Sequence, residues 1–389
     1  MVSVNNTGGL GDQTNVGIKV VDVDGTSAAG SFSLANAVQA GAYQYVLRQG
    51  GNAGDINDWY LVSSIIPVPA TPAIPIYRPA AVGYVAAQTA NREAGFSQIG
   101  TLHQRIGEQR HAEGDHKQLW MRTTVDGDRN HGRSSFNYKQ ALYGIQVGAD
   151  LMDRVNASGN NERAGLTLDY ARSDTDFSDS KRSLANLSKE TGDMKGNRFG
   201  IGAYYTHMAK DGTYLDIVGQ VSKLHNRFDD VYGGKATQKG WQTNLSAEVG
   251  KPIYHTQNGW AFEPQAQLIY QHTDYDSFND ELSSMKGYNT DNVRGRIGLR
   301  VFKDDSTINT LNNYYLIANL THDFMGTDKV NIGGTKVDER YDRSQAEIGV
   351  GAQSHISANS FFYTDARYSR SLNGNQEGGQ LNLGLKWQW

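Results

Sequence analysis

The sequence predicts an all-β protein built around a 12-stranded antiparallel transmembrane β-barrel. The first observation is the C-terminus, where apolar Leu381, Leu383, Leu385, Trp387 and Trp389 alternate with Asn382, Gly384, Lys386 and Gln388. This is the period of a strand with one apolar and one polar face. The same alternation recurs from residue 118 onward, and long connections alternate with short ones. Two indoles at a chain end suit the aromatic girdle of a membrane barrel better than the edge of a soluble sheet.

Composition narrows the possible classes. The chain has 389 residues, a net charge of −4, 44 Gly, 21 Tyr and no Cys. A mean hydropathy of −0.58 and the lack of apolar runs near 18 residues argue against transmembrane helices, whereas barrel strands average to a polar composition. The balanced charge provides no basic patch, so no nucleic-acid partner is expected. The first residues lack the basic and apolar segments of a signal peptide, so we expect a longer precursor.

Residues 1–66 are predicted to form a short β-rich segment. Gly, Asn and Asp separate brief apolar alternations at Val16–Ile18–Val20, Phe32–Leu34, Tyr43–Tyr45–Leu47 and Trp59–Leu61. Such spacing predicts stacked rungs or hairpins, as at the end of a β-solenoid. A small β domain of another kind is the alternative.

Two further segments precede the strands. Five of the seven prolines lie in residues 67–79, which predicts an extended, semi-rigid linker and a domain boundary. Residues 80–111 carry an apolar stripe at helical spacing, so we expect a helix there. Gly95, Gly100 and Gly107 each weaken that helix by about 1 kcal/mol relative to Ala, so either an outside partner holds it or it passes a tight space. An ordinary surface helix is the alternative.

Twelve strands are predicted in the remaining chain, 115–389. They cover residues 118–126, 139–151, 161–172, 196–208, 213–228, 238–251, 259–275, 290–303, 311–323, 342–357, 359–371 and 378–389. Connections after odd-numbered strands are mostly long (127–138, 173–195, 276–289, 324–341), and those after even-numbered strands are mostly short. An even strand number with this asymmetry is typical of an outer-membrane barrel that has both ends on the periplasmic side.

One face of these strands is polar and charged. Arg294, Arg296 and Arg300 share one face of a single strand, and an arginine facing hydrocarbon at the bilayer midplane costs about 2–4 kcal/mol. These side chains are therefore predicted to face a hydrated interior of mixed charge. The other charged residues predicted on inward faces include Glu248, Glu263, Glu347, Arg367 and Lys386.

Several short segments, in order along the chain, resemble the classical autotransporters, and in particular the pertactin and diffuse-adherence-adhesin group. Residues 43–47 (YQYVL) and 58–63 (DWYLVS) resemble the end of that family's secreted passenger. Residues 77–79 (YRP) and 100–108 (GTLHQRIGE) resemble its linker and pore helix, and residues 119–122 (LWMR) its first barrel strand. The C-terminus is similar to its barrel-assembly signal, with the key positions at Asn382, Gly384, Trp387 and Trp389.

The resemblance implies a barrel threaded by the α-helix, located in the Gram-negative outer membrane, which delivers and anchors its own N-terminal passenger at the cell surface. The passenger is expected to be an adhesin or autoaggregation factor, and residues 1–66 its C-terminal, autochaperone-like end. The implied partners are outer-membrane lipid, the barrel-assembly machinery, periplasmic chaperones and the passenger itself, with a monomeric barrel and no cofactor or metal. Arg92 and Glu93 on the helix are expected to pair with wall charges, whose candidates are Arg122, Glu248, Glu263, Arg294, Arg296, Arg300, Glu347 and Arg367. Solvated lumen charges are the alternative.

Two other classes were weighed. An outer-membrane protease or lipase barrel needs convergent catalytic groups, but the histidines are scattered singly, without a Gly-x-Ser-x-Gly or His-Glu-x-x-His motif. A diffusion porin needs an open lumen, which the predicted helix argues against. Some family members cut their passenger at an Asn–Asn pair in the helix, but here those pairs lie at residues 5–6, 160–161 and 312–313. No enzymatic activity is therefore predicted.

Overall fold

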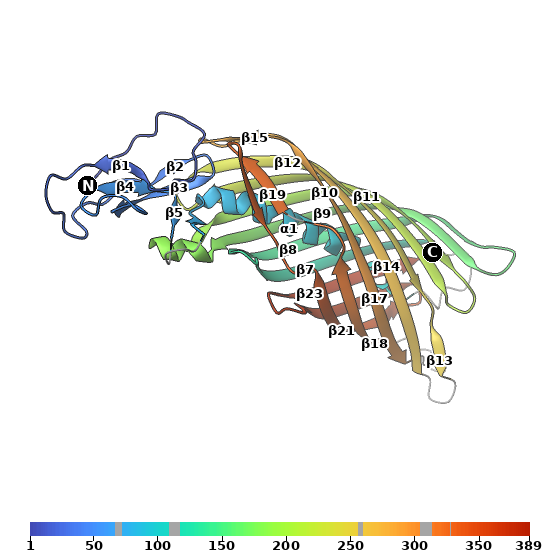
Figure 1. Ribbon diagram of the computed structural model, residues 1–389. Coiled ribbons are helices and arrows are strands. Elements are labelled where there is room, and N and C mark those ends of the chain that lie inside the picture. The colour runs from blue at the N-terminus through green and yellow to red at the C-terminus, as the bar shows by residue number, and fades with distance from the viewer. Residues whose placement is uncertain (67–71, 109–116, 256–259, 304–312, 327) are drawn as a thin grey trace.

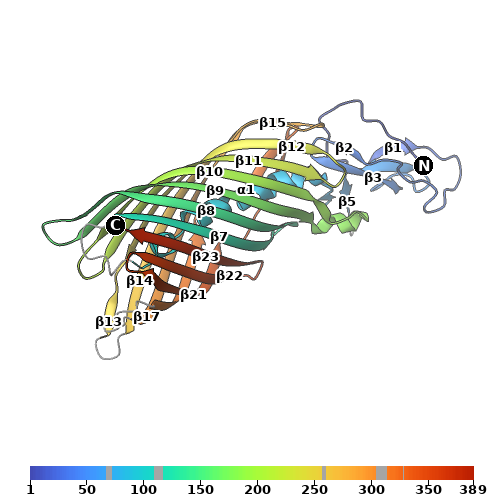
Figure 2. The ribbon, with the colours of Figure 1, turned by 180° about the vertical axis from the view of Figure 1, so that it is seen from behind.

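The computed structural model describes residues 1–66, 72–108, 117–255, 260–303, 313–326 and 328–389. A slanted β-barrel encloses a helix, and a small N-terminal sheet covers one mouth of the barrel (Figure 1). The C-terminus lies toward the opposite end (Figures 1 and 2). Neither helix in the described part of the chain is long and apolar enough to cross a membrane.

Twelve long strands form the barrel wall, as predicted. Consecutive strands pair antiparallel, and pairing between the first and last of them closes the wall. They are β7 (Gln118–His131), β8 (Phe136–Val155), β9 (Asn161–Asp179), β10 (Glu190–Met208), β11 (Tyr214–Asp230), β12 (Lys235–Gly250), β14 (Trp260–Tyr275), β17 (Tyr288–Lys303), β18 (Asn313–Asp323), β21 (Ser344–Ser357), β22 (Ser360–Ser371) and β23 (Gln376–Gln388). A short strand, β13 (Ile253–His255), extends the pairing of β14 at one end.

Several strands run beyond their predicted ends, so two of the predicted long connections are wrong. Residues 127–138 are mostly strand, with only 132–135 linking β7 to β8. Residues 173–195 extend β9 and β10, which are joined through a short 3₁₀ helix, η1 (Ser180–Ala185). The outward side chains of these extensions are polar, because they project past the apolar band. Phe136, Tyr138, Phe177 and Met194 are buried on the inner face, so the extensions lack the apolar-outward alternation that marked the rest.

The two faces of the wall separate as predicted. Outward residues such as Ile145, Leu168 and Ile297 are exposed, whereas Glu248, Glu263 and Arg300 are almost completely buried. The inward groups are buried because a helix fills the lumen beside them. The interior is of mixed charge, as expected.

The helix begins at Pro79 and is interrupted. α1 (Pro79–Ile99) starts with proline in its first turn, which suits that position because no backbone N–H is needed there. Gly100, with a φ of 61°, caps the end of α1, and α2 (Leu102–Ile106) begins two residues later. The prediction of one continuous helix over 80–111 is thus wrong, and residues 109–111 lie outside the described residues. α1 is buried on nearly all sides, which excludes an ordinary surface helix.

The N-terminal segment forms a four-stranded sheet in the order β1–β4–β3–β2. Its strands are β1 (Ile18–Val21), β2 (Val38–Ala40), β3 (Tyr43–Gln49) and β4 (Trp59–Val62). The predicted strand at Phe32–Leu34 is wrong: Leu34 makes only a single bridge to Val2, and the Phe32 ring packs edge-on against Trp59.

The proline-rich linker is partly anchored rather than a simple tether. β5 (Ser64–Ile65) pairs with β6 (Ile74–Pro75), which returns the chain to the sheet just before α1. Residues 67–71 lie outside the described residues.

Two long connections contain hairpins that close over the mouth. One is formed by β15 (Phe278–Asn279) and β16 (Ser284–Met285), the other by β19 (Asp328–Ile332) and β20 (Thr335–Glu339). Val330, Ile332 and Val337 of the second hairpin join a buried apolar cluster with α1 and the N-terminal sheet. This mouth is therefore packed, with one core shared by three parts of the chain.

Candidate functional site: the helix in the lumen

The candidate site is the lumen, where α1 and α2 meet the inner wall. α1 lies mainly against β8 to β11, so it is displaced toward one side of the barrel (Figure 2). Contacts hold it at three levels: the mouth beneath the N-terminal sheet, the middle, and the opposite end.

At the mouth, a buried arginine joins three elements. Arg78 forms an ion pair of 2.6 Å with Asp280 of the β15–β16 connection and donates to the carbonyl of Gly41. The Tyr84 hydroxyl donates to the same Asp280 carboxylate at 2.8 Å. The start of the helix is thereby tied both to the barrel rim and to the N-terminal sheet.

The β19–β20 hairpin forms a second attachment. Asp328 accepts hydrogen bonds from Thr89 and, at 3.0 Å, from Arg92. Directly across the two strands from Asp328, the buried carboxylate of Glu339 accepts the backbone N–H groups of residues 134, 135 and 136 at 2.8–2.9 Å. The hairpin thus bridges from the helix to the turn between β7 and β8.

In the middle of the lumen, Glu93 and Arg294 form a bidentate pair. The guanidinium donates to both Glu93 oxygens at 2.7 and 2.8 Å and to both oxygens of Asp323 at 2.6 and 2.8 Å. It also stacks 4.1 Å from the centre of the Phe96 ring. Planar pairing of this kind fixes orientation as well as charge, so it sets the rotation and depth of the helix.

Wall side chains also bind helix carbonyls. Arg198 donates to the Asn91 carbonyl at 2.9 Å, and Arg122 donates to the Gln98 carbonyl. Gly95 lets the wall approach closely: a Cβ there would lie 2.2 Å from Gln242 Oε1 and 2.5 Å from Gln271 Nε2. The glycine therefore marks the tight passage that its helix-weakening character suggested.

Beyond Gly100 the contacts are dense and charged. Glu248 accepts the N-terminal N–H of α2 from Leu102 at 2.9 Å, which suits an anion at a helix N-terminus. His103 Nε2 lies 2.8 Å from Glu263, and Arg105 pairs with Asp216. Arg300 pairs with Glu108 at 2.7 Å, while Arg296 lies 3.1 Å from Glu248.

The C-terminal strand contributes to the same site. Asn382 donates from its side chain to the Gln104 carbonyl at 2.9 Å, and Lys386 donates to the Glu108 carbonyl at 2.7 Å. Gly384 faces the Tyr363 ring, which a Cβ would meet at 2.0 Å. Trp387 and Trp389 point outward instead, about half exposed, with their rings 5.2 Å apart.

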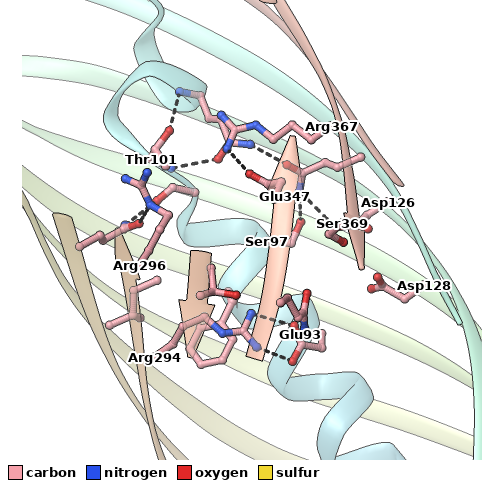
Figure 3. Close-up of a pocket in the computed structure, with 18 of the residues that line it drawn as sticks. Glu93, Ser97, Thr101, Asp126, Asp128, Arg294, Arg296, Glu347, Arg367 and Ser369 are labelled. Atoms are coloured by element: carbon pink, nitrogen blue, oxygen red, sulfur yellow. Dashed lines mark hydrogen bonds and ion pairs between the residues drawn. The ribbon is translucent and has the colours of Figure 1, made fainter. Parts of the chain in front are cut away.

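The helix leaves a cavity on its other side. Figure 3 shows this cavity of about 130 Å³, with Glu93, Arg294, Arg296, Glu347 and Arg367 around it. Arg367 pairs with Glu347 at 3.1 Å across it, so these two groups contact each other rather than the helix. In the described part of the chain, no three His, Asp or Glu side chains are arranged to hold a metal ion.

Of the ten charged candidates, Arg92 and Glu93 lie on the helix, and Arg122, Glu248, Arg294 and Arg300 contact it directly. Glu263 contacts His103 of α2, and Arg296 contacts Glu248, which in turn binds α2. Of the ten, only Glu347 and Arg367 pair with each other and not with the helix. Sequence reasoning missed Asp280, Asp328 and Glu339, because they lie in connections that carry no strand period. It also missed Arg198 and Asp216, although both occupy inward positions of alternating strands.

Two models of known protein families match parts of this chain. The family model described as the autotransporter β-domain matches residues 119–367. The chain belongs to the autotransporter β-domain family. A second model, Autochaperone Domain Type 1, matches residues 1–47.

Individual proteins agree with this membership. The chain is 28% identical to the adhesin BmaC autotransporter of Brucella suis over 99% of its own length but only 12% of that protein. It is 26% identical to the pertactin autotransporter of Bordetella parapertussis, covering 71% of this chain and 29% of the relative. The transport unit of AIDA-I from Escherichia coli has the same fold, with a TM-score of 0.63, 15% identity, and coverage of 80% of this chain and 100% of that one.

This autotransporter β-domain is thus an outer-membrane translocator domain of a Gram-negative bacterium. The covered mouth and the C-terminal end of β23 lie toward opposite ends of the barrel. The chain spans less than a third of the length of BmaC and of pertactin.

Proposed function

We propose that residues 1–66 form the C-terminal end of a longer passenger and serve as the template on which that passenger folds outside the cell. One observation carries the proposal: the N-terminal sheet shares a buried core with α1 and the outer hairpins. Residues 42, 43, 45 and 61 of the sheet lie in one cluster with residues 80–87 of the helix. A passenger held in this way starts folding from a fixed, ordered surface.

The same contacts suggest how outward movement is favoured. The lumen supplies no nucleotide-binding motif, so the free energy must come from elsewhere. When the passenger folds outside, each Å² of apolar surface that it buries stabilises the exported state by about 25 cal/mol. A folded segment on the mouth also blocks return through a lumen that the helix already fills. The match of residues 1–47 to an autochaperone model supports this role.

The proposed division of the chain follows. Residues 1–66 are the template, 67–79 the linker, 80–111 the pore segment that contains α1 and α2, and 115–389 the barrel. The helix is held by Glu93, Arg92, Arg294, Glu248 and Arg300, while Asn382, Gly384, Trp387 and Trp389 form the signal read by the barrel-assembly machinery after periplasmic chaperones deliver the chain. One barrel acts as a monomer.

The passenger is proposed to be an adhesin or autoaggregation factor, because BmaC is an adhesin and matches over nearly this whole chain. We infer no catalytic activity in the barrel, since the family is one of translocators. A diffusion porin is disfavoured because α1 occupies the lumen and contacts the wall at every level.

Deletion of residues 20–63 from the full-length protein tests the template role. Passenger export and protease resistance on intact cells are measured, with Ile56→Ser as the control because Ile56 is 75% exposed. The proposal predicts an exported but protease-sensitive passenger, or failed export, for the deletion alone. Unchanged export and surface folding would reject it.

A further inference from the structure

The outer face of the wall carries a groove that the translocation role does not use. It has a volume of about 640 Å³ and runs across β12, β14, β17 and β18 toward β21 and the end of β22. Its lining is mainly apolar, and its residues are Ala247, Val249, Ala266, Leu268, Gly295, Ile297, Leu320 and Phe324, with His322, Ser344 and Leu372 at one end. A lipid-facing barrel wall is normally convex, so we expect a hollow in it to hold another molecule.

Small residues shape the hollow. Ala247 pairs across the sheet with Leu268, which pairs with Gly295, while Ala266 pairs with Val249 and Ile297. Gly295 leaves space for the Phe324 ring, which a Cβ would meet at 2.9 Å. Alanine and glycine thus form the floor, and larger apolar side chains form the sides.

The direction of the groove relates it to the bilayer. At β12 it lies near the end of the strand that is opposite the covered mouth, whereas at β18 it reaches Phe324, the first residue of the connection that follows the strand. At β21 and β22 it meets Ser344, the first residue of its strand, and Leu372, just past the other. It therefore rises obliquely through the apolar band to the cell-surface rim.

The surface end of the groove is basic. Arg343 adjoins Ser344, and its guanidinium donates to the Gly326 carbonyl at 2.9 Å, close to Phe324. Arg370 lies two residues before Leu372, is exposed, and forms no ion pair among the described residues. The acid paired across the strands from it, Glu377, is bound to Arg129 at 3.0 Å.

We propose that this groove binds an outer-leaflet lipid, with one acyl chain along the Ala–Gly floor and a phosphate of the headgroup between Arg343 and Arg370. The apolar part of the groove lies in the hydrocarbon, where lipid is the surrounding solvent, and its basic end lies at the level of the headgroups. Selection of one lipid comes from shape and from the two cations rather than from hydrophobicity. A lipid bound in this groove gives the barrel one defined contact with the outer leaflet.

Native mass spectrometry of the full chain in detergent, titrated with lipid A, tests the proposal, with diacylglycerol, which carries no phosphate, as the comparison lipid. A basic residue near an anionic headgroup contributes about 1 kcal/mol, which is about fivefold in affinity. Replacing both arginines, Arg343→Gln and Arg370→Gln, is expected to weaken lipid A binding about 25-fold while leaving diacylglycerol binding unchanged. Arg172→Gln, an exposed arginine on the opposite wall, is the control and should change neither.

Filling the floor gives an independent test. Ala266→Phe is expected to weaken both lipids at least about fivefold, because the packing contacts of a chain in a fitted groove are lost. Ala203→Phe, an outward alanine on β10, is its control. Equal binding by Ala266→Phe and the wild type would overturn the proposal, as would an arginine pair that makes no difference. A wild-type dimer that Ala266→Phe dissociates would assign the groove to a second copy of the barrel and also overturn it.

Discussion

The Glu93–Arg294 pair offers the sharpest test of how the helix is held. Both side chains are about nine-tenths buried, and two N–O contacts of 2.7 and 2.8 Å join them. Breaking one partner of a buried pair costs about 3–5 kcal/mol. Glu93→Gln should destabilise the seated helix by about 2–3 kcal/mol, at or just below the low end of that range, because Arg294 keeps its contacts with Asp323.

If Glu93→Gln destabilises the seated helix by 2–3 kcal/mol relative to a displaced helix, the population of the displaced helix rises about 30- to 150-fold. The assay is single-channel recording in planar bilayers, where displacement opens the lumen. Arg129→Gln is the matched control, since the Arg129–Glu377 pair has a similar distance of 3.0 Å but is about half exposed and should contribute less than about 1 kcal/mol. The double variant Glu93→Gln with Arg294→Gln should be non-additive with the single variants. Opening no more frequent than in Arg129→Gln, or strict additivity, would refute the assigned role of the pair.

Three further predictions concern other parts of the site. Gly95→Val should destabilise the seated helix by about 1–3 kcal/mol through overpacking against Gln242 and Gln271, seen as more frequent channel opening, whereas Gly127→Ala, with open space around it, should not. Glu339→Ala should leave four backbone donors, those of residues 134, 135, 136 and 340, without this acceptor and expose Arg340 and Arg343 to trypsin on intact cells; an unchanged cleavage rate relative to Glu377→Ala would contradict this. Asn382→Ala should lower both the yield of the barrel, as part of the proposed assembly signal, and its thermal stability by about 1–3 kcal/mol, whereas Trp387→Ala should lower the yield without that loss of stability, as judged by outer-membrane abundance and heat-modified mobility.

The wall was predictable because charge and hydrocarbon are incompatible. Arg294, Arg296 and Arg300 fixed which face of β17 points inward, and the same reasoning extended to its neighbours. The signal stops where the strands leave the bilayer, since the outward side chains are polar there. Strand ends such as Asp128–His131 and Ser173–Asp179 were therefore interpreted as loops.

The partners of the helix were less predictable. Glu93 was expected to pair with a wall charge, but sequence alone cannot choose among three arginines on one face, because the choice depends on helix depth. Glycines in the helix were correctly interpreted as marking a tight passage, although the break at Gly100 was missed. The β19–β20 hairpin was also missed, even though Gly333–Gly334 between Val330, Ile332 and Val337 is a recognisable hairpin signal.

The most direct test of the central claim is orientation. A secretory signal peptide and an epitope tag are placed ahead of Met1, the protein is made in a Gram-negative host, and intact cells are treated with protease. Outward delivery predicts loss of the tag with a protected, barrel-sized remainder in the outer membrane. A tag that is cleaved only after the outer membrane is opened would place residues 1–66 in the periplasm and contradict the assignment of the covered mouth to the cell surface.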